Sequence, residues 1–185
     1  MKRILITGIT GLIGKHLMQR VLKDSNYSII GQYFSPRNTD EFTSLGVEMK
    51  KADICIESDL KDICEGCEIV VHSAAKVMDY GKKEDFYLAH YDATKWLLND
   101  ALKNKVRHFI YISSFGPATH IDRTNGLPDE TVPLVRSEVH YDNAKIDTED
   151  LVIKFCTKNY IKYTIIRPAA VIGPDSVWVR EPLKR

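Results

Sequence analysis

The sequence has no long apolar run, no excess of either charge and few cysteines, and each of these absences excludes a class of protein. No stretch approaches the roughly 20 apolar residues of a membrane span. The apolar run behind the basic residues 1–3 ends at Thr7 and Gly8, too early for a secretory signal. A net charge of +1 over 185 residues gives no electrostatic basis for binding nucleic acid. We therefore expect a cytoplasmic protein with reduced thiols that binds neither membranes nor nucleic acids.

Only four cysteines are present, and two of them, Cys64 and Cys67, form a C-x-x-C pattern; the others are Cys55 and Cys156. A zinc site needs a second such pair, or histidines at ligand spacing, and the sequence has neither. Cys67 also begins an apolar run that is typical of a buried strand. We therefore interpret the pair as structural and expect no metal.

Residues 4–14, ILITGITGLIG, organise the rest of the chain. The β-branched run at their start predicts a parallel strand that is covered on both faces. Gly8 suits a tight turn, Gly11 lets the backbone approach a pyrophosphate, and Gly14 lets the next helix pack against the strand. The N-terminus of that helix presents N–H groups and a positive dipole end to an anion. Strand, glycine turn and helix in this order predict a dinucleotide-binding site.

Strands and helices are predicted to alternate along the whole chain. After the first strand, strands are expected at residues 27–33, 47–50, 67–72, 107–112 and 162–167. Helices are expected after Gly14 and at residues 40–45, 58–64, 83–104 and 137–159, with a polar loop at 117–133. In the helix at 83–104, the predicted inner face is Trp96, Leu97, Ala101 and Leu102. This order predicts an α/β fold, a doubly wound parallel sheet with helices on both faces and ligands beyond the carboxyl ends of the strands.

The end of the second strand has no acidic residue to hold the 2′-hydroxyl of NAD, which such folds usually carry about 20 positions past the glycines. No carboxylate follows until Asp40, and the first charged residue is Arg37. A guanidinium without a competing acid favours a 2′-phosphate, hence NADP, although NAD remains possible if Arg37 is only a solvated loop residue. Asp53 could bond the adenine amino group with Ile54 beside the ring, or could simply cap a helix.

Tyr141 and Lys145 lie four residues apart, and therefore on one face of the last predicted helix. A nearby ammonium favours the phenolate and so lowers the phenol pKa from about 10. Such a pair can exchange a proton with a carbonyl oxygen. Ser113 and Ser114 follow the fifth strand, where a hydroxyl can donate to the same oxygen. Tyr91 and Lys95 have the same spacing in the middle of another helix, and we prefer Tyr141 because it lies near its helix start.

Several of these motifs together resemble those of the extended short-chain dehydrogenases/reductases, the NAD(P)-dependent epimerases, dehydratases and hydroxysteroid-type dehydrogenases. Residues 7–14, 52–54, 72–75 and 167–174 are similar to the family's motifs and follow its order. Ser114, Tyr141 and Lys145 match its catalytic triad, in which the lysine also holds the nicotinamide ribose. The resemblance implies a Rossmann-type NAD(P)-binding domain over residues 1–174. A tail at 175–185 would then begin a substrate domain that this sequence lacks.

The predicted cofactor site combines the glycine turn, the adenine end, the loop after the fourth strand and the nicotinamide side. Its members are Thr7, Gly8, Thr10, Gly11, Leu12, Ile13, Gly14, Arg37, Asp53, Ile54, Ser73, Ala74, Ala75, Lys76, Tyr141, Lys145, Pro168 and Val171.

Within the family, residues 72–91 are most similar to the 3β-hydroxysteroid dehydrogenase and dihydroflavonol reductase branch. The chain departs from the family at His90, where members often carry Asn, and in ending soon after Pro174. The apolar residues 177–179 would be an uncovered face or a dimer contact. The resemblance also suggests a homodimer.

Three functions follow as hypotheses. The first is an NADP-dependent oxidoreductase that transfers a hydride between nicotinamide and a secondary alcohol or ketone, a small-molecule substrate. The second is a nucleotide-sugar epimerase or dehydratase that regenerates its cofactor in each cycle. The third is a cofactor-binding module without catalysis, which the short chain permits.

Overall fold

Strands and helices alternate along the chain in the order that the sequence predicts. The computed structural model describes residues 1–35, 39–78, 80–118, 133–173 and 176. Its strands are β1 (Lys2–Thr7), β2 (Tyr27–Tyr33), β3 (Glu48–Lys51), β4 (Ile69–His72), β5 (His108–Ile112) and β6 (Lys162–Ile166). Its α-helices are α1 (Leu12–Val21), α2 (Asp40–Ser44), α3 (Lys83–Tyr87), α4 (Ala93–Lys103) and α5 (His140–Lys158). Shorter turns are the 3₁₀ segments Glu57–Leu60 and Gly116–Ala118 and the π-helical turn Leu88–Asp92, labelled η2.

All six strands are parallel and form one sheet in the order β3-β2-β1-β4-β5-β6. The order reverses between β1 and β4, where Ile6 pairs with Gly31 of β2 on one side and Val71 of β4 on the other. A reversal of this kind leaves a crevice beyond the carboxyl ends of the strands, because the connections on either side leave in opposite directions. The predicted doubly wound, Rossmann-type fold is confirmed.

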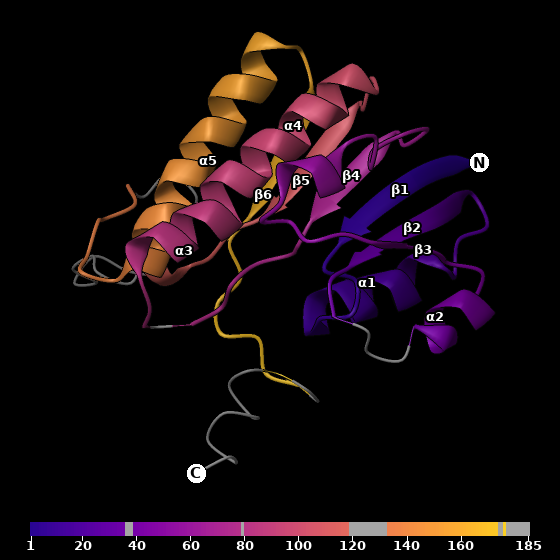
Figure 1. Cartoon of the computed structure of the whole chain (residues 1–185), viewed down its shortest axis with the longest axis horizontal. Coiled ribbons are helices and arrows are strands. Elements are labelled where there is room, and N and C mark those ends of the chain that lie inside the picture. The colour runs from indigo at the N-terminus through magenta and orange to yellow at the C-terminus, as the bar shows by residue number, and fades with distance from the viewer. Residues whose placement is uncertain (36–38, 79, 119–132, 174–175, 177–185) are drawn as a thin grey trace.

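Helices cover both faces of the sheet and bury a separate apolar core on each (Figure 1). On one face, α4 and α5 pack on β1, β4 and β5 through residues such as Leu97, Val152 and Phe109. On the other face, α1 and α2 pack on β1 and β2 through Met18 and Phe42. Within the described residues, none of the helices combines the length and the apolar character needed to cross a bilayer.

Some predicted elements differ in detail from the structure, and the helix expected at 83–104 is divided into α3, the π-helical turn and α4. The helix expected at 58–64 is only the 3₁₀ turn Glu57–Leu60, because the following turn is held by the carboxylate of Asp100, which accepts from the amides of Asp62 and Cys64. The prediction that Leu102 faces inward is wrong, because this residue is 41% exposed, whereas Leu98 is buried. Leu102 follows the sheet-facing Ala101 by one residue, which turns it about 100° around the helix.

Four predictions fall on residues outside the described ranges, one of them the predicted contact of Arg37 with a 2′-phosphate. Most of the loop at 117–133, the proposed domain boundary at Pro174 and the apolar residues 177–179 belong to them. The division into a domain and a tail therefore stays a prediction.

Candidate active site

The glycine turn after β1 is shaped by contacts that exclude a side chain. Gly8 has φ +64°, and a Cβ on it would lie 2.8 Å from the Cα of Ala74. A Cβ on Gly14 would lie 2.7 Å from the Cα of Ile9 and closer still to the carbonyl oxygen of Gly8. Both obstacles are main-chain atoms, so neither can rotate away. The turn therefore brings the start of α1, the end of β1 and the loop after β4 into contact with one another.

The first turn of α1 presents its main-chain amides to this crevice. Gly11 is the N-cap in an extended conformation, with φ −79° and ψ 169°, and no acidic residue lies in the first turn. The first N–H groups of a helix have no intrahelical acceptor, so they and the positive end of the helix dipole are available to an anion. Leu12, Ile13 and Thr10 line the same space. The arrangement suits the diphosphate of a dinucleotide.

Gln32, at the end of β2, holds the turn from the other side. Its side chain is 1% exposed; Oε1 accepts from the amide of Gly8 at 2.8 Å, and Nε2 donates to the carbonyl of Ala52 at 2.6 Å. The two bonds tie the glycine turn to the segment after β3. No feature of the sequence singled out Gln32, because an amide at that position becomes informative only once its two main-chain partners are known.

Thr7 does not line the cavity, and its side chain is fully buried. Its hydroxyl accepts from the amides of Ser73 and Ala74, both at 3.2 Å, and therefore donates its own proton to Nδ1 of His72 at 2.7 Å. Nε2 of His72 then carries the ring proton and faces the Thr94 hydroxyl at 3.0 Å. Burial lowers the pKa of His72 to about 3, so the ring is neutral. The structure gives Thr7 the task of shaping the loop after β4.

The predicted adenine end is lined by Asp53, Ile54 and Cys55, with Phe34 from the end of β2. Oδ1 of Asp53 accepts from the amide of Cys55 at 2.9 Å, so the carboxylate closes its own turn while still facing the cavity. Arg37, the predicted contact for a 2′-phosphate, lies outside the described residues.

The loop after β4 runs along the floor of the cavity with Ser73, Ala74, Ala75 and Lys76. The hydroxyl of Ser73 donates to the carbonyl of Thr7 at 2.6 Å. At the rim, Nζ of Lys76 lies 2.7 Å from Oδ2 of Asp85, and both side chains are partly exposed. This ion pair holds the pKa of Asp85 below its usual value.

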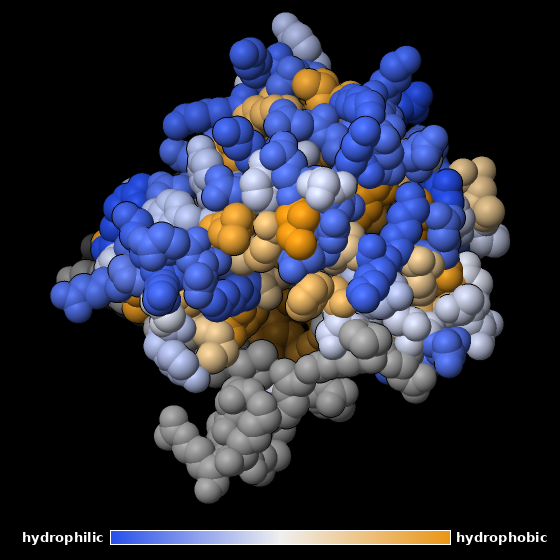
Figure 2. Space-filling model, viewed as in Figure 1, coloured by the Kyte–Doolittle hydropathy of each residue, from blue (hydrophilic) through white to orange (hydrophobic). Residues whose placement is uncertain are grey.

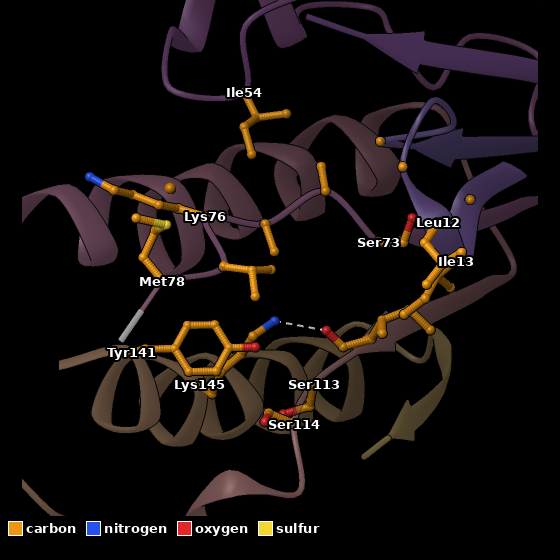
Figure 3. A pocket seen from close by; sticks show the side chains of 18 of the residues that line it. Leu12, Ile13, Ile54, Ser73, Lys76, Met78, Ser113, Ser114, Tyr141 and Lys145 are labelled. Atoms are coloured by element: carbon orange, nitrogen blue, oxygen red, sulfur yellow. Dashed lines mark hydrogen bonds between the residues drawn. The ribbon is translucent and has the colours of Figure 1, made fainter. Parts of the chain in front are cut away.

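Tyr141 and Lys145 project from the first turns of α5 toward the same cavity, and Ser114 lies after β5 (Figure 3). Nζ of Lys145 lies 5.7 Å from the centroid of the Tyr141 ring. Oγ of Ser114 accepts from the amide of Gly116 at 3.1 Å, which leaves the hydroxyl proton for another acceptor. The neighbouring Ser113 is 3% exposed, and its hydroxyl has no partner within the described part of the chain.

Lys145 is 1% exposed, which is unusual for a lysine. Its ammonium donates to the carbonyl of Ile112 at 2.8 Å and lies 4.8 Å from the centroid of the Tyr111 ring. Burial lowers the pKa of Lys145 to about 7, although the carboxylate of Glu149, one turn along α5, opposes this shift. The amine is therefore poised between its charged and neutral forms near neutral pH.

Glu149 is itself held by a buried ion pair. Its carboxylate accepts from Nε and Nη2 of Arg167, at 3.0 and 2.7 Å, just after β6. The side chain of Glu149 is 3% exposed and that of Arg167 is 24% exposed. The pair joins α5 to the end of β6, next to the predicted nicotinamide residues Pro168 and Val171. Sequence spacing could suggest Glu149 beside Lys145, but not the pairing with Arg167.

These groups surround one cavity of about 970 Å³. Figure 2 shows its mouth as a hollow with apolar walls, below the largely polar surface of the helices. Of the predicted site residues that the structure describes, all except Thr7 line it. It takes residues from the turn after β1, the loop after β4, the end of β5 and the start of α5, as a dinucleotide with an adjoining substrate would require.

The other two residue pairs that the sequence offered, Tyr91 with Lys95 and Cys64 with Cys67, do not line this cavity. Tyr91 is in the π-helical turn, with its ring 6.5 Å from that of Tyr87. Cys64 and Cys67 are buried free thiols, and burial raises the pKa of each. Among the described residues, no three His, Cys, Asp or Glu side chains are grouped so that they would hold a metal ion.

Comparison with known proteins places these features in context. A profile of the NAD dependent epimerase/dehydratase family matches residues 4–182. A UDP-glucose 4-epimerase of Vibrio cholerae is 29% identical over 181 residues, which are 94% of this chain and 53% of that protein. A decarboxylating sterol-4-alpha-carboxylate 3-dehydrogenase of Dictyostelium discoideum is 24% identical over 94% of this chain and 54% of its own length.

Solved structures show the same fold. A UDP-glucuronic acid 4-epimerase of Bacillus cereus in complex with NAD superposes with a TM-score of 0.78 at 26% identity, covering 94% of this chain and 58% of that one. The chain thus spans about half the length of the curated relatives that it matches.

Proposed function

The chain belongs to the NAD dependent epimerase/dehydratase family, and on that premise we propose that it binds a nicotinamide adenine dinucleotide and acts as an oxidoreductase on a secondary alcohol or ketone. The observation that carries the proposal is the meeting, in one cavity, of the glycine turn with Tyr141, Lys145 and Ser114. A phosphate-binding turn without these side chains would support binding alone.

The residues present fit a dinucleotide. Side chains are excluded at Gly8 and Gly14, so the main-chain amides at the start of α1 would hold the diphosphate. Asp53 and Ile54 would face the adenine, and Pro168 and Val171 the nicotinamide, whose ribose Lys145 would bind. When bound, the nicotinamide ring supplies or takes up the hydride.

The chain's own side chains would transfer the proton. The Tyr141 phenol would exchange it with the substrate oxygen, while the Ser114 hydroxyl would donate to that oxygen as charge develops on it. The ammonium of Lys145, 5.7 Å from the phenol ring centroid, would favour the phenolate. Because the pKa of Lys145 is about 7, this assistance decreases as the pH rises through neutrality.

NADP is the form that we propose. Among the described residues, two carboxylates line the cavity, those of Asp53 and Asp85, and neither comes from the end of β2. The cavity residues there are Gln32, whose amide is already bonded at both ends, and Phe34 and Ser35. A 2′-phosphate thus meets no acidic side chain from this strand, and Arg37 follows two positions after Ser35 in the sequence.

A nucleotide-sugar epimerase or dehydratase is the second candidate, favoured by the 29% identity to the Vibrio cholerae UDP-glucose 4-epimerase. The two candidates share the cavity and differ in the fate of the dinucleotide. Net consumption of NADPH with a carbonyl substrate supports the first, whereas interconversion of a nucleotide sugar without net consumption supports the second.

The direct experiment is to titrate the protein with NADPH and NADH and then assay it against a carbonyl panel, with Tyr141→Phe as the test variant. We expect Tyr141→Phe to reduce turnover by about 10²–10⁴-fold and to leave the dinucleotide Kd within a few-fold. Equal loss of binding and turnover contradicts the assignment of the phenol. Binding without any turnover by the unmodified protein would leave a cofactor-binding module.

Cofactor preference has its own test. A carboxylate installed by Ser35→Asp should weaken NADPH binding and favour NADH, because it restores the acid that β2 lacks and repels the 2′-phosphate. Arg37→Ala should weaken NADPH binding much more than NADH binding. An unchanged ratio of the two Kd values in both variants removes the preference for NADP.

A further inference from the structure

His90 is a buried histidine for which the proposed chemistry has no use. It lies in the π-helical turn Leu88–Asp92 that interrupts the helix between α3 and α4, and its side chain is 1% exposed. A π-helical turn places one extra residue in the helix and recurs at functional sites. A fully buried imidazole is also uncommon, since its polar atoms need partners. Burying an imidazole in a π-helical turn is therefore energetically unfavourable, which indicates that the side chain has a specific role.

One edge of the imidazole is bonded to the loop that forms the cavity floor. Nε2 of His90 lies 3.1 Å from the carbonyl oxygen of Lys76. A carbonyl only accepts, so Nε2 carries the ring proton and donates it. Burial, together with the positive charge of Lys145, lowers the pKa of His90 well below its ordinary value, so the ring is neutral. The bond fixes the main chain at the end of the segment that lines the predicted cofactor site.

The ring itself is packed against the phenol. The centroids of the His90 and Tyr141 rings are 5.3 Å apart, and the planes meet edge to face at 83°. Phe86 stacks with His90 at 6.5 Å and 12°, and also meets Tyr141 edge to face at 6.4 Å, so the three rings form a triangle of mutual contacts. Edge-to-face contacts of this kind fix the orientation of a ring as well as bury it. Figure 1 shows α3 beside the start of α5, which is how the three rings meet.

We propose that His90 is a positioning residue, which holds the phenol of Tyr141 and the main chain of Lys76 in one fixed relation through two separate parts of its side chain. The aromatic ring orients the phenol, and the Nε2–H group anchors the cavity floor. This role rests on the proposed function, because it serves the alignment of a proton donor with a bound dinucleotide. Alignment matters at this scale, since a displacement of about 1 Å in an active site can reduce the rate about 100-fold.

The two parts of the role can be removed one at a time. His90→Phe keeps an aromatic ring and removes the donor, so the carbonyl of Lys76 is left without its N–H partner. His90→Gln keeps a donor of similar reach and removes the ring. A side chain that only fills space predicts the same loss in both variants, in proportion to their stability.

The experiment uses the full chain with [¹³Cζ]tyrosine and two readouts. The first is the Kd for NADPH, measured by calorimetry. The second is the ¹³C resonance of Tyr141 and its titration with pH, identified among the nine tyrosines by its disappearance in Tyr141→Phe. We expect His90→Phe to weaken NADPH binding about 10-fold with the Tyr141 resonance nearly unchanged. We expect His90→Gln to shift the resonance and the phenol pKa while the Kd stays within about 3-fold.

Equal changes of both readouts in both variants, or no change in either, overturn the proposal. Thermal unfolding of each variant separates these outcomes from loss of the fold. A further test uses the unmodified chain, whose ¹⁵N-histidine spectra must show His90 as the neutral Nε2–H form at pH 7. If NADPH fails to bind the unmodified chain, the proposed function fails, while the tyrosine and histidine spectra still decide whether His90 orients the phenol.

Discussion

The two halves of the chain, built around β1–β3 and β4–β6, border the same cavity but differ in the kinds of polar side chain that they bury. In the described residues before β4, the buried polar side chains are Thr7 and Gln32, and both are uncharged. From β4 onward, the structure buries two imidazoles, an amine and three carboxylates, namely His72, His90, Lys145, Asp100, Asp142 and Glu149. We call the first the main-chain half, because its described part buries no acidic, basic or imidazole side chain, and the second the titratable half, because it buries six.

The difference reflects what each half would do. A main-chain cradle is rigid, has no protonation state and requires that side chains be absent, which is why it depends on glycine. Proton transfer near neutral pH requires the opposite, side chains whose pKa values burial and neighbouring charges have shifted. The cost of burying charge is therefore confined to the half that uses it. Four substitutions test this contrast.

The largest effect is expected from Gly14→Ala in the main-chain half. The added Cβ would meet the Cα of Ile9 at 2.7 Å and the backbone of Gly8, and backbone cannot move aside. We expect a loss of about 3 kcal/mol or more in unfolding free energy, measured by urea titration, together with loss of NADPH binding. Gly46→Ala is the matched control, since Gly46 has φ +81° but no atom within 4 Å of the new Cβ. Its expected cost is about 1 kcal/mol, from the left-handed backbone alone, and equal costs would contradict the close approach.

In the titratable half, Glu149→Gln is expected to have the next largest effect. It removes a buried carboxylate that accepts hydrogen bonds from Nε and Nη2 of Arg167, whose side chain keeps some access to water. We expect the unfolding free energy to fall by about 2–3 kcal/mol, toward the low end for a broken buried pair. The pKa of Lys145 should fall further, because the carboxylate of Glu149, which raises it, is gone. Glu138→Gln on the exposed side of the segment before α5 should change neither quantity.

Lys145→Met tests the same half through pH. The pKa of Lys145 is about 7 in the folded state and about 10.4 in the unfolded chain. Between these two pKa values the unfolded state binds more protons than the folded state. This group therefore makes the free energy of unfolding rise as the pH increases above 7, and that contribution is lost as the pH falls back toward 7. We expect the unfolding free energy of the unmodified chain to gain roughly 1.5–2 kcal/mol more than the variant between pH 7 and 8.5. The cysteine thiols titrate in both proteins and cancel. Parallel pH curves would show that the amine is not buried.

The smallest effect is expected at the rim, from Asp85→Asn. The ion pair between Lys76 and Asp85 is partly exposed on both sides, so solvent and salt screen it. We expect a smaller change in unfolding free energy than for the other three substitutions, and less again in 0.5 M salt. A larger loss would mean that the loop after β4 depends on this pair rather than on its bonds to Thr7 and His90.

The main-chain half is the one that the sequence predicts well. Glycine spacing is visible directly, and it indicates the close approaches at Gly8 and Gly14 because no other residue satisfies them. The bounds of β2 are also predicted correctly at Tyr27–Tyr33, where Ile29 and Ile30 lie between tyrosines, residues that favour strands.

The titratable half is predicted less completely, because its chemistry depends on contacts between distant positions. Tyr141 and Lys145 are recognisable from their spacing, but the burial that lowers the pKa of Lys145 is not. Glu149 pairs with Arg167 across 18 positions, and His90 meets Tyr141 across 51. The π-helical turn that places His90 has no period in the sequence that would separate it from an ordinary helix, so the helix at 83–104 is predicted as regular.

The two hydrogen bonds made by the Gln32 side chain have a consequence for amide hydrogen exchange. Turn amides normally exchange quickly with solvent, but the N–H of Gly8 donates to a buried side chain that is itself anchored at Ala52. Its exchange should therefore be as slow as that of the neighbouring strand amides, and should require the opening of two strands at once. A few residues later, the first amides of α1 lack an intrahelical acceptor and should exchange freely until an anion protects them. One short segment would thus contain both the slowest and the most ligand-sensitive amides of the cavity.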